Sequence, residues 1–211
     1  MLSRTLLEEY AAERVFVKKG HHLVLEGAQT SSVYFQLTGW ASAECVSQRG
    51  ERVLMDFLTA GDFIGLADEG PCAAYSVTAM TDLLALRIER SQLQELIDYD
   101  QAFREICFGV LRSALLRTRS RRLALSAKSG LSKVCQVLSD LAERAEALST
   151  YAANDFTRPR LPLSQVILAS AVGLTPVAVN RIVQSLRRAG LIDWGVSGVS
   201  ILDTRRLREF A

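Results

Sequence analysis

A segment of thirty residues near the C-terminus, Leu163–Ile192, constrains this chain more than any other. It reads LSQVILASAVGLTPVAVNRIVQSLRRAGLI, which predicts two short helices joined by a tight turn. Ser164 and Thr175 stand where the helices begin, and their side-chain oxygens can accept free amide protons of the first turn. Gly173 supplies the left-handed residue that ends a helix and turns the chain. The segment therefore predicts a helix-turn-helix.

The second helix of this pair has one apolar and one polar side. Val179, Val183 and Leu186 recur at helical spacing and face inward, while small, amide and guanidinium groups remain outside, as a helix in the DNA major groove requires. The residues expected at the groove are Thr175, Val177, Ala178, Asn180, Arg181 and Gln184. The candidate phosphate contacts are Ser164, Gln165, Arg187 and Arg188. A helical hairpin with a solvated basic face is the alternative.

A β-hairpin is expected directly after these helices. Residues 191–194 and 199–202 are strand candidates around a turn at 195–198, and a closing helix is expected over 204–210. A helix-turn-helix followed by a small hairpin is a winged helix. No Lys or Arg stands at the tip of this wing, so we expect only backbone or Ser197 contacts to phosphate there.

Charge is distributed unevenly along the chain. Residues 1–100 hold 8 Lys and Arg against 15 Asp and Glu, a net charge of −7, whereas residues 101–157 carry +4 and residues 158–211 carry +5. A phosphate backbone repels the acidic part and attracts the basic part. This polarity indicates a regulator with a sensory or protein-facing end and a nucleic-acid end.

The first hundred residues have the pattern of a small β domain. Strand candidates cover residues 13–17, 22–26, 32–37, 40–47, 53–58, 73–78 and 83–88, after a short helix over residues 3–12. Many short strands at regular spacing predict an antiparallel, jelly-roll-like β-roll. The predicted fold is α+β, with the roll in residues 1–100, a long dimerisation helix in 101–127 and a winged helix-turn-helix in 128–211.

The long helix carries two apolar stripes. Phe103, Cys107, Val110 and Ala114 alternate at spacings of four and three, which predicts a two-fold contact in a homodimer. The second stripe, Phe108, Leu111 and Leu115, is expected to cover the β-roll. The alternative is that both stripes belong to the intramolecular core. The arginines at 117, 119, 121 and 122 are expected in solvent, with a position close to DNA near the hinge as the alternative. Gly130 is expected to break the helix, and residues 149–162 are expected to form an irregular connector.

Several classes of protein are excluded by what the sequence lacks. The four cysteines have no CxxC spacing, which indicates reduced thiols in a cytoplasmic protein without a metal or iron–sulfur site. No apolar run is long enough for a bilayer, so no membrane contact is predicted. The sequence has no nucleophile elbow and no phosphate loop, so it does not indicate an enzyme. We therefore predict no cofactor and no metal.

Four segments carry a family resemblance that extends over nearly the whole chain. They are KKGHHLVLEG, VYFQLTGWAS, RGERVLMDFLTAGDFIG and GLTPVAVNRIVQSLRRAGLI. Together they resemble the Crp/Fnr superfamily of bacterial transcription regulators. The resemblance implies a cyclic-nucleotide-binding-like roll, a long dimerisation helix and a winged helix. It also implies a homodimer that binds a roughly palindromic promoter site in duplex DNA and contacts RNA polymerase.

The chain departs from this family at positions that carry chemistry. Leu66 stands where members that bind cyclic AMP have a ribose-binding Glu, and Ala73-Ala74 replace the Arg-Ser pair that holds the cyclic phosphate. A buried phosphate without such partners costs several kcal/mol, so cyclic-nucleotide binding is not expected. Val177 replaces a Glu that reads cytosine in the best-known half-sites, whereas Arg181 matches the second base contact.

The predicted function is a sequence-specific, DNA-binding transcription regulator. Whether a signal controls it stays open at this point. The roll could bind an unidentified small-molecule effector, Cys107 could form a redox switch across the dimer seam, or a ligand-free dimer could be controlled by its abundance. A different class, a small-molecule-binding module whose helix-turn-helix contacts only protein, would show no salt-sensitive affinity for duplex DNA.

Overall fold

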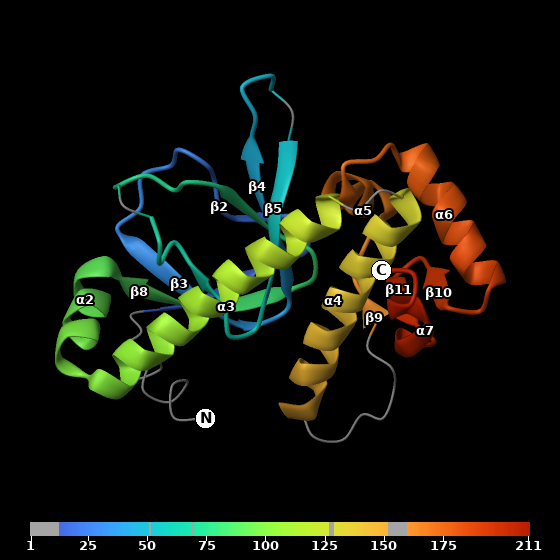
Figure 1. The fold of residues 1–211 in the computed structure, drawn as a ribbon. Helices are drawn as coiled ribbons and strands as arrows, with labels where there is room; N and C mark the ends of the chain where they lie inside the picture. Colours follow the sequence, from blue (N-terminus) through green and yellow to red (C-terminus); the bar gives the residue numbers. More distant parts are fainter. Residues whose placement is uncertain (1–12, 51, 69, 127–128, 152–159) are drawn as a thin grey trace. The chain divides into compact units, whose positions relative to one another are not determined.

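A computed structural model describes residues 13–50, 52–68, 70–126, 129–151 and 160–211 (Figure 1). The chain forms two compact units, residues 1–117 and 118–211. The helix expected over residues 3–12 lies outside the described residues.

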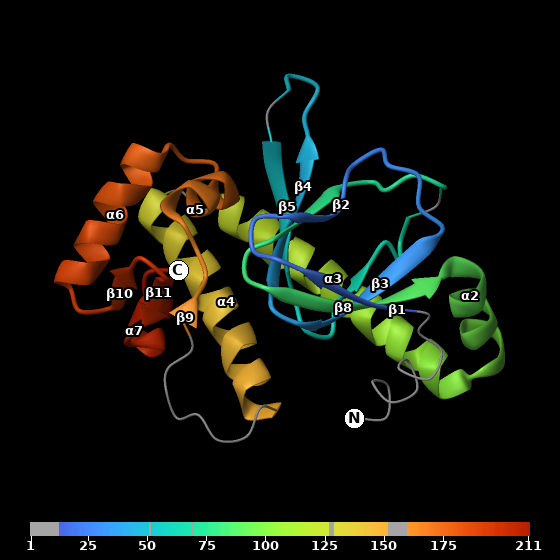
Figure 2. The same ribbon diagram turned by 180° about the vertical axis from the view of Figure 1, so that it is seen from behind.

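The first unit contains two four-stranded antiparallel sheets, which Figures 1 and 2 show from opposite sides. The first sheet has the order β1 (Glu13–Val17), β8 (Leu83–Glu89), β3 (Ser32–Thr38) and β6 (Phe63–Ile64). The second has the order β2 (His22–Val24), β7 (Ser76–Ala79), β4 (Trp40–Val46) and β5 (Arg52–Thr59). These sheets confirm the predicted antiparallel roll. Sequence analysis missed β6, whose two residues are too few to show a period.

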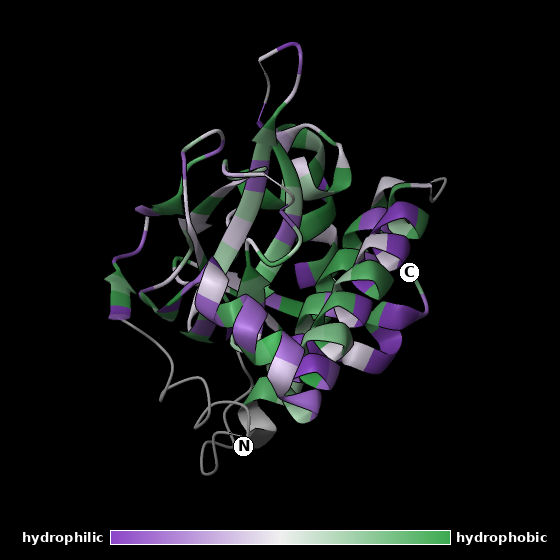
Figure 3. Cartoon of the chain, turned by 90° about the vertical axis from the view of Figure 1, so that its left-hand side faces the viewer, coloured by the Kyte–Doolittle hydropathy of each residue, from purple (hydrophilic) through white to green (hydrophobic). Residues whose placement is uncertain are grey.

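The interior of the roll is built by alternating strand residues. Val33 and Ile88 are completely buried in one apolar cluster, and Val77 and Ala85 are completely buried in the other. Figure 3 shows hydrophobic and hydrophilic residues alternating along the strands. Burying one large aliphatic side chain contributes about 1.5–3 kcal/mol, so these rows stabilise the roll. Between β3 and β4, Gly39 has φ 87°, and a Cβ there would overlap the carbonyl oxygen of Asp82.

Two helices follow the sheets, α2 (Arg90–Tyr99) and α3 (Gln101–Ser126). Phe103 and Cys107 of α3 are 1% and 4% exposed and pack into the same cluster as Val33. Val110 is partly buried against this cluster, and Ala114 is half-buried. Two residues of the predicted dimer seam, Phe103 and Cys107, therefore lie in the core of one chain, and that part of the prediction is wrong.

The second stripe of α3 is also placed differently from the prediction. Phe108, Leu111 and Leu115 do not cover the roll, because their side chains are 62%, 37% and 52% exposed. The stripe that packs against the roll is thus the one that the sequence assigned to the dimer contact. Both have the same periodicity, and periodicity alone cannot tell which apolar side of a helix meets which partner.

The sequence predicted that Arg117 of α3 lies in solvent, and this prediction is wrong. Its Nε lies 3.1 Å from Oδ2 of Asp56, and its Nη2 lies 2.9 Å from Oδ1 of Asp62. Asp62 is nearly buried and also accepts a hydrogen bond from the backbone N–H of Thr59. Burial lowers the pKa of Arg117, but Asp62 and Asp56 outweigh burial and raise it. This ion pair fixes α3 to strand β5 and the turn that follows it.

The second unit is a winged helix, as predicted. Its helices are α4 (Gly130–Tyr151), α5 (Gln165–Val172), α6 (Pro176–Arg188) and α7 (Thr204–Arg208). Its sheet has the order β10 (Ile192–Gly195), β11 (Gly198–Ile201) and β9 (Arg160–Leu161). The core includes the fully buried Leu138, Leu168, Val179 and Leu207. Gly130 begins α4, and sequence analysis missed β9, which lies within the predicted irregular connector.

Candidate nucleic-acid interface

The turn between α5 and α6 is held by the residues that sequence analysis identified. The Oγ of Ser164 accepts a hydrogen bond from the N–H of Ile167, and the Oγ1 of Thr175 accepts one from the N–H of Ala178, both at 3.2 Å. Gly173 ends α5 in the left-handed conformation, with φ 64° and ψ 40°. The chain turns by 107° between the two helices. Helix-turn-helix motifs place their helices at about 90–120°, so the predicted motif is confirmed.

Helix α6 separates its apolar and polar residues as the sequence predicted. Val179 and Val183 are completely buried and Leu186 is 3% exposed. Of the candidate DNA contacts, Gln165 and Ala178 are half-buried; the exposed ones are Ser164, Thr175, Val177, Asn180, Arg181, Gln184, Arg187 and Arg188. The structure thus brings the proposed base contacts together on α6 and at Thr175, the residue that caps it. Such an exposed row matches the width of a major groove.

The arginines of α6 differ in how firmly they are held. Within the described part of the chain, Arg181 has no hydrogen-bond or ion-pair partner, so its guanidinium is available to a ligand. Arg188 donates from Nε to the carbonyl oxygen of Gln184 at 3.3 Å. Arg187 and Arg188 occupy the last turn of α6, where positive charge interacts favourably with the helix dipole.

Two features of this surface were not found by sequence analysis. Val166 on α5 is 65% exposed, the same fraction as Val177 on α6, and it was not among the candidates. Arg160 on β9 donates to Ser197 and Asp193 of the wing. The pairing of a two-residue strand with β11 leaves no periodic signal, so only the basic character of Arg160 could have drawn attention to it.

Within the roll, the positions that the resemblance links to cyclic-nucleotide binding have apolar or acidic surroundings. Leu66 packs against the apolar cluster, and Ala73 is 5% exposed. The N–H of Ala74 points to Oδ2 of Asp68 at 3.4 Å, and the N–H of Gly65 donates to the phenol oxygen of Tyr75 at the same distance. Burial is the main cause that raises the pKa of Tyr75. The guanidinium of Arg90 also lies here and donates to the carbonyl oxygens of Gly65 and Asp68, so a bound anion would meet a carboxylate and a phenol beside a cation that already has backbone partners.

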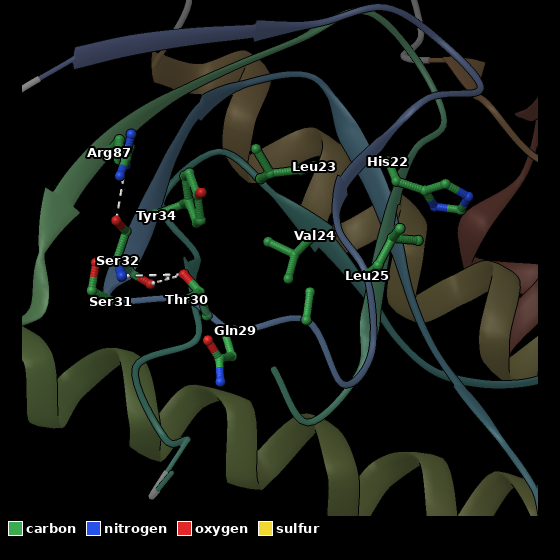
Figure 4. A pocket seen from close by; sticks show the side chains of 11 residues that line it. His22, Leu23, Val24, Leu25, Gln29, Thr30, Ser31, Ser32, Tyr34 and Arg87 are labelled. Atoms are coloured by element: carbon green, nitrogen blue, oxygen red, sulfur yellow. Dashed lines mark hydrogen bonds between the residues drawn. The ribbon is translucent and has the colours of Figure 1, made fainter. Parts of the chain in front are cut away.

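A separate cavity of about 460 Å³ lies beside β2 and β3 of the roll. Leu23 and Val24 line one side, and Ser32, Tyr34 and Arg87 line another (Figure 4). The charge of Arg87 is already compensated, because its guanidinium donates to Ser32 and pairs with Glu13 and Glu89. Hydrogen bonds from Ser31 and Ser32 lower the pKa of Glu89 and keep it ionised. The cavity therefore favours an uncharged molecule that carries both polar and apolar groups.

The proposed redox role of Cys107 is not supported by its surroundings. Burial raises the pKa of this thiol to about 11, so it is protonated at neutral pH. The thiolate is the species that forms disulfides. Cys107 also packs into the core of its own chain. Among the described residues, no group of three or more His, Cys, Asp or Glu is arranged to hold a metal ion.

Comparison with known proteins agrees with this geometry. Residues 14–100 match the family model of the cyclic nucleotide-binding domain, and residues 132–210 match that of the Crp-like helix-turn-helix domain. The chain is 29% identical to the transcriptional activator protein FnrL of Cereibacter sphaeroides over 193 residues, covering 91% of this chain and 77% of FnrL. It is also 29% identical to the nitrogen fixation regulation protein FixK of Bradyrhizobium diazoefficiens, covering 96% of this chain and 84% of FixK.

Among solved structures, FixK2 from Bradyrhizobium japonicum has the same fold. It superimposes with a TM-score of 0.79 at 20% identity, covering 94% of this chain and 96% of FixK2. In the described residues no single helix is long and apolar enough to cross a membrane, although the bent pair α5 and α6 would satisfy that test together.

Proposed function

Because the chain belongs to the Crp/Fnr family of transcription regulators, we propose that it binds a nearly palindromic DNA site as a homodimer and needs no cyclic nucleotide to do so. FnrL is a transcriptional activator and FixK a regulator, and this chain carries the same kind of helix-turn-helix. The chain is thus a DNA-binding transcription regulator and not an enzyme. The family resemblance extends the proposal to contact with RNA polymerase at the promoter.

The observation that carries the dimer is the exposed apolar row Phe108, Leu111 and Leu115 on α3. These residues follow one another at spacings of three and four, as the seam of a two-stranded coiled coil does. The other stripe of the helix is occupied by its own roll, through Phe103 and Cys107. A row of large apolar side chains left in water marks an interaction site, and a second copy of α3 offers the matching row.

The proposed half-site contacts follow from the exposed residues of α6. Arg181 can donate to both acceptors of a guanine, a pair worth about 1–3 kcal/mol of discrimination. Asn180 can pair with an adenine, and Val177 can touch a thymine methyl group. Since Val177 cannot accept a hydrogen bond from a cytosine amine, we expect a half-site that differs from those read by family members with a Glu at this position.

Independence from cyclic nucleotides is supported by the residues around Gly65 in the roll. The cyclic phosphate would need a cation or several hydrogen-bond donors, since a buried charge without them is unstable. Ala73 and Ala74 provide neither in their side chains, and Asp68 adds a negative charge. Tyr75 already receives the N–H of Gly65, and the guanidinium of Arg90 is engaged by the carbonyl oxygens of Gly65 and Asp68.

A second candidate is a regulator gated by an uncharged effector. The cavity beside β2 and β3 favours it, because apolar side chains such as Leu23 and Val24 line it together with hydroxyl groups such as that of Tyr34. Under this alternative the chain without its effector would bind DNA only weakly and without sequence preference.

Substitution in the exposed row of α3 tests the proposed dimer. Leu111→Asp would place two carboxylates in the apolar seam, at a cost of several kcal/mol. We expect sedimentation to show a monomer, and the affinity for a palindromic site to fall by about a hundredfold or more, since about 1.4 kcal/mol corresponds to tenfold.

Ser113→Asp is the matched control, because Ser113 is exposed on the same helix but lies outside the seam positions. This variant is expected to remain a dimer with unchanged DNA affinity. A Leu111→Asp protein that stays folded and dimeric would contradict the proposed interface. Addition of cyclic AMP to the unsubstituted chain is expected to leave its DNA affinity unchanged, and a rise of tenfold or more would refute nucleotide independence.

A further inference from the structure

A positively charged side chain from another segment of the chain, that of Arg160, lies at the wing. Between Asp193 and Gly198 the hairpin has no Lys or Arg. Arg160 reaches it from β9, the strand that pairs with β11, some thirty residues earlier in the chain. Its Nη1 lies 3.2 Å from the Oγ of Ser197 at the turn, and its Nη2 lies 3.0 Å from Oδ2 of Asp193 on β10.

The wing is shaped to receive this guanidinium. A Cβ at Gly195 would lie 2.8 Å from Nη1 of Arg160, so the absence of a side chain there makes room for the charged group. A guanidinium has five N–H donors, and the bonds to Ser197 and Asp193 use two of them. Among the described residues the other donors have no partner and remain for a ligand, and the side chain of Arg160 is 37% exposed.

We propose that Arg160 is the phosphate-binding residue of the wing, held in position by Ser197 and Asp193. The proposal rests on the DNA-binding function above and adds a contact to it. Arginine suits this role, because its planar fork matches the geometry of a phosphate and its charge persists at all physiological pH values. A group that is already oriented also loses less conformational freedom on binding than a free surface arginine would.

A purely structural role for Arg160 explains less of the arrangement. The ion pair with Asp193 is exposed on both sides, 37% and 52%, and exposed pairs contribute little to stability. The backbone pairing of β9 with β11 already joins the two segments. These contacts therefore add little to stability, and their main result is that they orient a positive charge at the tip of the wing.

The salt dependence of DNA binding tests the proposal. In the full-length Arg160→Gln protein, we expect the slope of log K against log salt concentration to decrease in magnitude by about 0.9 per protomer, the value for one lost phosphate contact. At 0.1 M salt this corresponds to roughly an eightfold loss per protomer, equal for specific and random duplexes. Arg160→Lys keeps the charge and is expected to retain the slope.

Arg208→Gln is the matched control, because Arg208 also forms an exposed ion pair in this unit, with Glu143 of α4. It removes the same charge and is expected to leave the slope unchanged. An unaltered slope in Arg160→Gln, or an equal change in both variants, would overturn the phosphate contact while leaving the proposed function intact. If the unsubstituted chain showed no salt-sensitive DNA binding, both proposals would fall.

Discussion

The two units of this chain differ in how much of the binding chemistry expected from the family resemblance they carry. In the winged helix, the turn geometry and the exposed polar residues of α6 are both present, from the Ser164 and Thr175 caps to the free guanidinium of Arg181. In the roll, the sheets and their apolar core are present, but Leu66 and Ala73 stand where the family resemblance expects ligand-binding groups. A fold is maintained by many core residues, whereas a binding site depends on a few side chains and can be lost without loss of the fold.

The largest expected effect is the loss of stability of the winged helix when one of its glycines is replaced. Gly198→Ala is expected to destabilise the second unit by about 3 kcal/mol or more, because φ is 119° there and a Cβ would overlap the carbonyl oxygen of Leu161. Chemical denaturation followed by Trp194 fluorescence, in a Trp40→Phe background, measures this loss.

Gly109→Ala on α3 is the control for that substitution. Nothing lies within 4 Å of a Cβ at Gly109, and alanine is favoured over glycine inside a helix, so a gain of about 1 kcal/mol is expected. Equal effects of the two substitutions would contradict the view that the wing depends on close backbone packing.

The next largest expected effect is the loss of DNA affinity in variants of the helix-turn-helix, which distinguishes base contacts from phosphate contacts. Arg181→Ala is expected to weaken binding to the selected half-site by about 1–3 kcal/mol and to leave binding to random DNA nearly unchanged. Arg188→Ala is expected to weaken binding to all sequences alike and to reduce the salt dependence. Fluorescence anisotropy with specific and random duplexes at several salt concentrations measures both, and equal, salt-independent losses would contradict the assignment.

The smallest expected effect at neutral pH is the low reactivity of the buried thiols, one in each unit. Burial raises the pKa of Cys107 in the roll unit and of Cys135 in the winged helix to about 11. Both are expected to resist alkylation at pH 8, while the exposed Cys72 reacts. Because the folded pKa values are raised, each thiol stabilises the fold fully below the pKa of an unfolded thiol, about 8.5, and this contribution is lost as pH rises toward 11.

Mass spectrometry after timed alkylation checks the order of reaction. Rapid modification of Cys107 in the folded protein would contradict the burial of that side of α3 and restore the redox hypothesis.

The features that the sequence predicted correctly are those that local chemistry determines. The capping residues of α5 and α6 and the glycine of the turn act within a few positions along the chain, so they can be recognised without a structure. The roll was recognisable because its strands are short, alternate in polarity and are separated by turn residues.

The features that the sequence did not predict depend on contacts between distant segments. The two stripes of α3 have the same period, so only packing shows that Phe103 faces the roll and Leu111 faces solvent. Arg117 finds its carboxylates at Asp56 and Asp62, more than fifty residues earlier. Arg160 lies in a strand too short to recognise and contacts a wing that follows the helix-turn-helix.

The most direct test of the whole account is selection of bound sequences from a random duplex pool, with purified protein and nothing added. A ligand-independent dimeric regulator is expected to recover a palindrome, with guanine at the position that Arg181 reads. Weak, salt-sensitive binding without sequence preference would contradict ligand independence and would direct attention to the cavity beside β2 and β3.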